Sequence, residues 1–395
     1  FASGAGHGEQ RYLVLNLTPG LGWHESQPES LAPAHLDALR AKLPFDHRGP
    51  VRLAVCYIFS YLNNASPATF DAALRQCLAT AEATDTPVLI ALDGENWWGA
   101  RPDLWNWWDP TKPGYDPQNA RNVEWCGPGP EHAVKLAWRN WGRQIRIGPP
   151  PNLMSPRYRA ACDEQMRRIV PIIAAWGQAL PADKRDLFVG VKLGWESSIG
   201  VNAWYYPGGN DLLDRDPRDD PQTGLKTDLL PSRGVATLGY AAVATAGLRT
   251  DGQVTEADQV EVVRRHLADL CRQARELGLP RDRIFTHGVG WKEGEQLYQA
   301  AVNADSCPGW SAYHHAADVP RDPGIQAALA RSDAPCWAVV EWLLGGPRQT
   351  APWQAALEAT LADPKCRYLC IFNWESIRAD AAVLDALRAV VTAPR

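Results

Sequence analysis

The sequence has no run of about 18 apolar residues, the length that a membrane-spanning helix requires. It also has no excess of basic charge, because 40 Lys and Arg stand against 45 Asp and Glu and give a formal net charge of −5. A basic surface is the electrostatic signature of binding to nucleic acid or to anionic membranes. We therefore expect no nucleic acid and no membrane among the partners, and nothing in the sequence indicates an oligomeric state.

The motifs of common cofactor and metal sites are missing as well. The nine cysteines form no Cys-x-x-Cys pair, and no Gly-x-Gly-x-x-Gly turn follows the first apolar strand. We therefore expect no cofactor. One disulfide among Cys126, Cys307 and Cys366 is left open. The first residue is not methionine, which fits either a secreted or periplasmic protein that has lost its export signal or a trimmed chain.

What the sequence does contain is a regular alternation of apolar strands and helical segments. Strands are predicted at 12–17, 51–59, 87–92, 187–193, 284–287, 309–315, 336–342 and 368–375, and helices near 31–43, 67–84, 156–179, 255–277 and 380–391. Strands this apolar are buried on both faces, as in a parallel sheet covered by helices. Eight such units close naturally into a barrel, so the predicted fold class is α/β, a (β/α)₈ TIM barrel.

Two long irregular segments interrupt this alternation, after the third and the fourth strand. They cover about residues 95–155 and 199–254 and are rich in Gly, Pro, Trp and Asp. Because both follow strands, both are expected at the same end of the barrel, where they would form the walls of a site. We predict one catalytic barrel domain over residues 1–395, with these segments as insertions.

Tryptophan is the unusual residue, with 18 in the chain and eight of them at positions 97, 98, 105, 107, 108, 125, 138 and 141. Aromatic faces with a polar N–H suit sugar rings, whose faces are apolar and whose edges are polar. The alternative is an aromatic core within the insertion. Arg139, Arg143 and Arg146 lie among these tryptophans, and they indicate either recognition of an acidic sugar or attachment of the insertion to the barrel rim.

Glu196 and Glu341 end the fourth and seventh strands, and barrel enzymes build their sites at strand ends. An ionised side chain after such apolar strands is costly unless the barrel mouth holds it. Cleavage of a glycosidic bond needs two carboxyl groups on opposite sides of that bond. Glu196 and Glu341 are therefore the predicted catalytic pair. Predicted to bind substrate are Asp93, Glu95, Trp97, Trp98, Trp195, His287, Tyr313, His314, Asn373, Trp374 and Glu375.

The histidines His287, His314 and His315 raise the question of a metal ion. Neighbouring residues on a strand face opposite sides, so His314 and His315 are not expected to reach one ion. We therefore predict no metal site.

Glutamates that end strands four and seven, with Trp374 ending strand eight, resemble clan A of the retaining (β/α)₈ glycoside hydrolases. The resemblance implies that Glu196 is the acid/base, that Glu341 is the nucleophile and that Trp374 floors the subsite of the reacting sugar. It also implies that Tyr313 supports the nucleophile. The chain departs from the clan pattern at Trp195, where many members have asparagine. A second departure is Tyr61-Leu-Asn-Asn, where many members carry an arginine at the end of strand two.

The predicted function is hydrolysis of an oligo- or polysaccharide by a retaining double displacement, with a carbohydrate as the partner. Three alternatives are open. The first is an inverting glycosidase or a polysaccharide lyase that uses Asp93 or Glu95. The second is a carbohydrate-binding barrel without catalytic activity. The third is a metal-dependent barrel hydrolase that uses the histidines at the strand ends.

Overall fold

The computed structural model describes residues 10–63, 66–96, 98–141, 144–212, 234–291 and 294–393. Its main sheet has eight strands in the order β10-β11-β12-β1-β2-β3-β6-β9, all paired in parallel. The two ends of this order also meet, because the Gly288 N–H donates to the Gly309 carbonyl (2.9 Å) and the Ser311 N–H to the Gly288 carbonyl (3.0 Å). The sheet is thus closed, and the predicted (β/α)₈ barrel is confirmed.

All eight predicted strands are present. They are β1 (Arg11–Leu17), β2 (Val51–Ser60), β3 (Val88–Asp93), β6 (Phe188–Leu193), β9 (Ile284–Thr286), β10 (Gly309–Ala312), β11 (Trp337–Trp342) and β12 (Cys366–Ile371). Strands β10 and β12 end three and four residues earlier than predicted. The residues after these two ends therefore turn into the barrel mouth instead of continuing the pleat.

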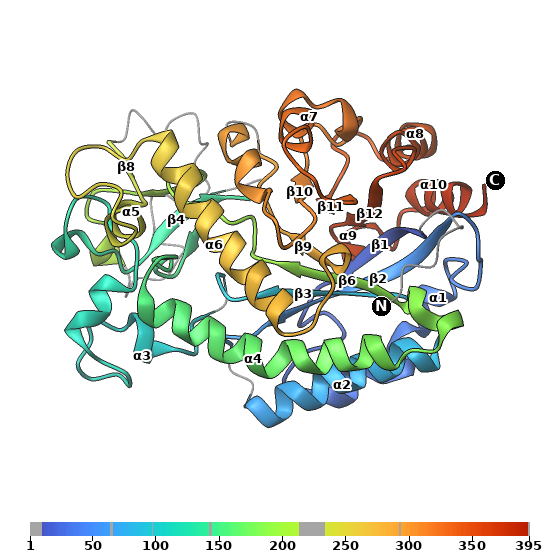
Figure 1. The fold of residues 1–395 in the computed structure, drawn as a ribbon, viewed down its shortest axis with the longest axis horizontal. Coiled ribbons are helices and arrows are strands. Elements are labelled where there is room, and N and C mark those ends of the chain that lie inside the picture. The colour runs from blue at the N-terminus through green and yellow to red at the C-terminus, as the bar shows by residue number, and fades with distance from the viewer. Residues whose placement is uncertain are drawn as a thin grey trace.

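Helices cover the outside of the barrel (Figure 1). The longer ones are α2 (Pro67–Ala83), α4 (Pro156–Ala179), α6 (Glu256–Glu276), α8 (Thr350–Leu361) and α10 (Ala381–Thr392). The shorter α7 (Pro323–Leu329), α9 (Trp374–Ile377) and the 3₁₀ segments η5 (Ala182–Leu187), η10 (Arg281–Arg283), η11 (Glu295–Ala301) and η12 (Val319–Arg321) complete the connections. Ser66, Ser155 and Thr255 cap α2, α4 and α6, because the side chain of each accepts a backbone N–H from the first turn of its helix.

The helix predicted near 31–43 is wrong in extent. The chain there forms two 3₁₀ turns, η1 (Pro28–Leu31) and η2 (Pro33–Leu36), and a single α turn, α1 (Asp37–Arg40). Pro28 and Pro33 each open a turn, and proline cannot donate the N–H that would continue a helix through them.

The two insertions are joined to each other. The first carries α3 (Pro102–Trp105), η3 (Pro117–Arg121), η4 (Pro130–His132), β4 (Ala137–Asn140) and β5 (Gln144–Ile147). The second carries β7 (Ala203–Tyr205), η6 (Gly209–Leu212), β8 (Ala236–Thr237) and α5 (Tyr240–Thr245). Their strands form one antiparallel sheet in the order β5-β4-β7-β8, which the sequence analysis did not predict. Figure 1 shows these elements gathered on one side of the barrel.

All nine cysteines lie in the described part of the chain, and none is joined in a disulfide, so the bridge considered among Cys126, Cys307 and Cys366 is not formed. Cys307 precedes β10 and Cys366 begins β12, and β11 lies between these strands. The nearest sulfur to Cys307 belongs to Cys336, at 3.1 Å. Among the helices of the described residues, none combines the length and apolar character that a membrane span needs.

Closure between β9 and β10 requires a residue without a side chain at Gly290. A Cβ built there would lie 1.6 Å from the Ser311 carbonyl oxygen, so the backbone must move to admit it. We expect Gly290→Ala to lower the free energy of unfolding by about 1–3 kcal/mol or more. The matched control is Gly148→Ala, whose added Cβ meets nothing within 4 Å. Urea unfolding followed by tryptophan fluorescence measures both, and equal midpoints for the two variants would contradict the tight closure.

Candidate active site

The barrel brings Glu196 and Glu341 together at its mouth. Glu341 lies on β11, and Glu196 lies in the turn after β6. Each is only 3% exposed. One carboxylate oxygen of each glutamate and one ring nitrogen of His287 lie within 4.8 Å of one another. Strands four and seven of the barrel therefore deliver their carboxylates to one place, as the sequence analysis expected.

Glu341 has partners that stabilise its ionised form. The Tyr313 hydroxyl donates to Oε2 at 2.6 Å, and the Lys192 ammonium lies 3.7 Å from Oε1. Lys192 is completely buried and donates to the Val340 carbonyl at 3.2 Å. Burial raises the pKa of Glu341, while the Lys192 charge and the Tyr313 hydrogen bond oppose that rise. The contact expected between Tyr313 and Glu341 is thus present.

Glu196 has surroundings of the opposite kind. Burial raises its pKa to about 8, and the negative charge of Glu341 adds to this rise. A hydrogen bond from Ser311 and the charges of Arg139 and Lys192 act in the lowering direction but do not cancel it. Its Oε1 finds no hydrogen-bond partner among the described residues. Glu196 is therefore mostly protonated at neutral pH, while its neighbour has a cation to keep it charged.

His287 completes the group at the base of the mouth. Its Nε2 lies 3.2 Å from the Ser311 hydroxyl and 3.7 Å from Glu341 Oε1. Burial lowers the pKa of His287 well below its usual value, so the ring is neutral. A neutral imidazole and two carboxylates are chemically able to hold a metal ion. The ammonium of Lys192, however, already supplies a positive charge at the same oxygen of Glu341.

Glu95 braces the turn that carries Glu196. Its Oε1 accepts hydrogen bonds from the Trp195 N–H (3.2 Å) and the Ser197 hydroxyl (2.5 Å), and it lies 3.0 Å from His266 Nε2. Glu196 itself has φ of 45°, a left-handed backbone conformation that is unusual for a residue with a side chain. Glu95 thus fixes both neighbours of a residue whose backbone needs outside support.

Asp93 supports Glu95 in turn. Its Oδ1 accepts from the N–H groups of Glu95 (2.8 Å) and Asn96 (3.2 Å), and the residue is completely buried. Burial raises the pKa of Asp93 to about 7. These contacts give Asp93 and Glu95 positioning roles, and their predicted contacts with substrate stay predictions.

The end of β12 is tied to the end of β1. The Asn373 side chain donates to the Thr18 hydroxyl at 2.9 Å. Glu375 accepts from both the N–H (3.2 Å) and the hydroxyl (3.0 Å) of Thr18. Trp374 begins α9 between them and is 6% exposed. Asn373 and Glu375 therefore form one cross-strand network with Thr18, and the binding of substrate by Trp374 stays a prediction.

The tryptophans of the first insertion divide into two groups. Trp98 is 4% exposed, donates to the Pro149 carbonyl and packs against Tyr158, while Trp105 and Trp107 pack against Trp108. These contacts are typical of an aromatic core and not of a free stacking surface. Trp141, in contrast, is 40% exposed. Trp195 lies at the site, beside Lys192 and His287, and Trp97 lies outside the described residues.

Lys192 and Arg139 belong to the site but were not among the predicted site residues. Lys192 is the one charged residue in the strand Phe188–Leu193, and a lysine in so apolar a strand needs a buried partner, which was a usable signal. Arg139 lies over the rings of Trp141 and Trp291 and is 3.4 Å from the Asn96 side chain. Arg146 bonds the Leu212 carbonyl and so links the two insertions, and Arg143 lies outside the described residues.

The expectation that His314 and His315 face opposite sides of a strand is wrong. It assumed that both lie on a strand, but β10 ends at Ala312 and both histidines lie in the turn that follows. Their ring centroids are 4.5 Å apart. His314 is also 3.8 Å from Glu295, so its nearest partners are Glu295 and His315.

Fold and site together define a (β/α)₈ barrel with a buried pair of glutamates at its mouth. No protein-family model matches the chain, and no curated protein matches its sequence. Among solved structures it is similar to a GH5-4 broad specificity endoglucanase from an uncultured bacterium, with 9% identity, a TM-score of 0.43 and coverage of 97% of this chain and 93% of that one.

Two further solved structures are similar at a comparable level. The exo-β-1,4-mannosidase Op5Man5 from Opitutaceae bacterium strain TAV5 has 10% identity and a TM-score of 0.45, over 97% of this chain and 59% of that one. A double mutant of the Cellulomonas fimi endo-β-1,4-mannanase has 12% identity and a TM-score of 0.41, over 98% and 71%. Similarity at this level does not show an activity, so the activity has to be argued from the residues of the site.

Removal of the Glu95 carboxylate should destabilise the protein. Glu95→Ala leaves buried donors of the 195–197 turn without their acceptor, and we expect a loss of about 1–3 kcal/mol in the free energy of unfolding. The matched control is Glu261→Ala, which breaks ion pairs with Arg264 and Arg265 on the surface of α6 and should cost about 1 kcal/mol or less. Urea titration compares the two, and a smaller loss for Glu95→Ala would refute the bracing role.

Proposed function

We propose that the chain is a retaining glycoside hydrolase that cleaves an oligo- or polysaccharide, with Glu196 as acid/base and Glu341 as nucleophile. The observation that carries this proposal is the close pair of buried carboxylates with oxygens within 4.8 Å of each other. Retaining enzymes place the two groups about 5–5.5 Å apart, whereas inverting enzymes need about 6.5–9.5 Å to admit a water molecule. An approach of two carboxylate oxygens to within 4.8 Å favours the shorter, retaining separation over the wider, inverting one.

The different surroundings of the two groups support the assignment of roles. Glu196, with its raised pKa, holds the proton that the leaving oxygen needs. Glu341, beside Lys192 and Tyr313, holds the negative charge that attacks the anomeric carbon and forms the glycosyl–enzyme bond. Glu196, then ionised, takes a proton from the water that hydrolyses this bond, and the pair returns to its starting state.

The alternative functions have less support from the contacts of the site residues. An inverting hydrolase or lyase based on Asp93 or Glu95 would need one of them to reach the substrate. Asp93 is completely buried, and three polar groups of the protein already surround Glu95 Oε1. A carbohydrate-binding barrel without turnover and a metal-dependent hydrolase are separated from the proposal by the experiments below.

Activity should depend on both glutamates. On a panel of aryl glycosides and oligosaccharides, Glu196→Ala and Glu341→Ala should each lose about 10²–10⁴-fold in kcat/KM on the substrate that the parent cleaves. Azide should restore product formation in Glu341→Ala and yield a glycosyl azide of inverted configuration. Glu261→Ala serves as a control and should leave the rate unchanged, and an excess of chelator should not abolish turnover.

Near-normal turnover by Glu341→Ala would refute the assignment of the nucleophile. Inactivation by the chelator would favour the metal-dependent reading. Binding of a saccharide without turnover of any panel member by the parent would favour the carbohydrate-binding barrel.

The pH profile should report the two carboxyl groups and the Lys192 charge. Because Glu196 acts protonated, kcat/KM should fall as pH rises through its pKa of about 8. Because Glu341 acts ionised, kcat/KM should also fall as pH drops through its own raised pKa. Lys192→Met removes the cation that lowers both values, so both limbs should move to higher pH, the acidic one by about 1–3 units.

The matched control for Lys192→Met is Arg52→Met. Arg52 is also a buried cation, but it lies at the start of β2 and pairs with Asp186 and Asp85, at the opposite end of the strands. This variant should lose stability without any shift of the pH limbs. Limbs that stay in place for Lys192→Met, or move equally in both variants, would contradict the electrostatic role of Lys192.

A further inference from the structure

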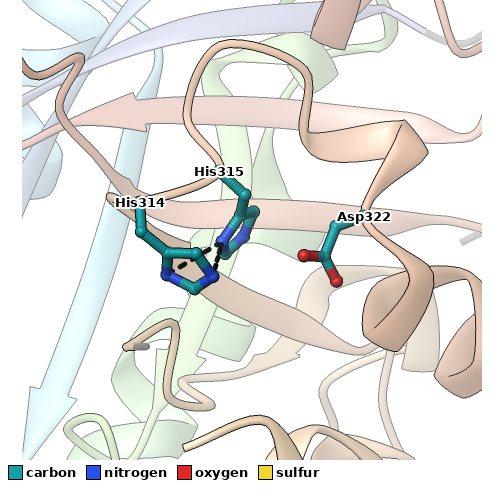
Figure 2. A group of neighbouring side chains, drawn as sticks. All are labelled: His314, His315 and Asp322. Carbon is teal, nitrogen blue, oxygen red and sulfur yellow. Dashed lines mark hydrogen bonds between the residues drawn. The ribbon is translucent and has the colours of Figure 1, made fainter. Parts of the chain in front are cut away.

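A second group of chemically active side chains lies in the connection from β10 to α7. His314 and His315 occupy the turn after β10, and Asp322 is the N-cap of α7. Figure 2 shows the two imidazoles together, with the Asp322 carboxylate directed toward them from the start of the helix. One ring nitrogen of each histidine and one oxygen of Asp322 lie within 4.8 Å of one another.

The separation of the two imidazoles suits a shared ion. His315 Nδ1 lies 3.4 Å from His314 Nδ1 and 3.3 Å from His314 Nε2. Two nitrogens bound to one zinc at 2.0–2.1 Å with a tetrahedral angle are about 3.3–3.4 Å apart. A hydrogen bond between the rings explains the contact less well, because it is long and divided between both nitrogens of His314.

The surroundings of the two rings suit a cation. Glu295 Oε1 lies 3.8 Å from His314 Nε2, so a carboxylate faces that nitrogen without a direct hydrogen bond. The Oδ1 of Asp322 accepts the Ile325 N–H at 2.9 Å, which fixes the carboxylate in place. His315 Nε2 is buried and has no hydrogen-bond partner in the described part of the chain. Two carboxylates thus face two imidazoles that are ligands when neutral.

We propose that His314, His315 and Asp322 bind a zinc ion, with the Glu295 carboxylate close to His314. Two imidazoles and one carboxylate are typical zinc ligands, whereas Mg²⁺ and Ca²⁺ prefer sites built of oxygen. The ion joins the turn after β10 to the first turn of α7. The turn after β10 begins with Tyr313, whose hydroxyl donates to Glu341. Zinc therefore fixes a segment beside the barrel mouth without taking part in the reaction.

The test is titration of the folded protein with ZnCl₂ by isothermal calorimetry, after treatment with chelator and gel filtration. We expect one zinc per chain with micromolar or tighter affinity, and no heat from MgCl₂. His314→Ala should weaken binding about 10–100-fold or abolish it. Asp322→Ser should have the same effect, although serine still caps α7 and so keeps the helix intact. Unchanged zinc affinity in either variant would overturn the proposal.

Two controls separate this site from other zinc ligands. His132→Ala removes an exposed histidine that also has a carboxylate, Glu131, at 3.8 Å but belongs to no cluster of metal ligands in the described residues, and it should bind zinc like the parent. Substitution with Co²⁺ should give the visible spectrum of a tetrahedral site with nitrogen and oxygen ligands. Thiolate charge-transfer bands, or a loss of zinc in His132→Ala, would place the ion elsewhere and refute the site.

Discussion

The ion pair between the buried side chains of Lys192 and Glu341 is the interaction on which the barrel mouth depends. Two carboxyl groups lie within 4.8 Å of each other and almost out of contact with water, and removal of an ion from water costs several kcal/mol even after relaxation. The Lys192 ammonium offsets the charge of Glu341, and Glu196 carries a proton. These three side chains together therefore have no net charge. Without Lys192 both carboxyls would tend toward the protonated form, and only the Tyr313 hydrogen bond would still favour the charge of Glu341.

Acid/base and nucleophilic roles require two carboxyl groups with different proton affinities and a fixed geometry. Contacts from the strands next to β6 fix the geometry of Glu196. Glu196 has a left-handed backbone, which costs of order 1–3 kcal/mol in a residue with a side chain and persists only where its surroundings impose it. Glu95, after β3, holds the Trp195 N–H and the Ser197 hydroxyl, while the Ser197 N–H donates to the His287 carbonyl after β9. The strands on both sides of β6 thus determine where Glu196 points.

The strand pattern was predictable because parallel barrel strands are apolar on both faces, and their carboxyl ends necessarily meet at one rim. That reasoning located Glu196, Glu341 and Tyr313. It failed where strand periodicity was extended past the end of a strand, as at His314 and His315. The β4–β7 pairing could not be predicted in this way, because β4 has four residues, β7 has three, and the two strands come from different insertions.

The positive charge beside Glu341 is supplied by the strand that leads to Glu196. Tyr61, which follows β2, is buried and carries no charge. The cation next to Glu341 comes from β6, four residues before Glu196, which lies in the turn after that strand. Coulomb energy depends on the distance between charges and on the dielectric, and not on which strand supplies the charge. A lysine inside the barrel, with its ammonium 3.7 Å from Glu341, therefore provides the positive charge that an ionised carboxylate in this place requires.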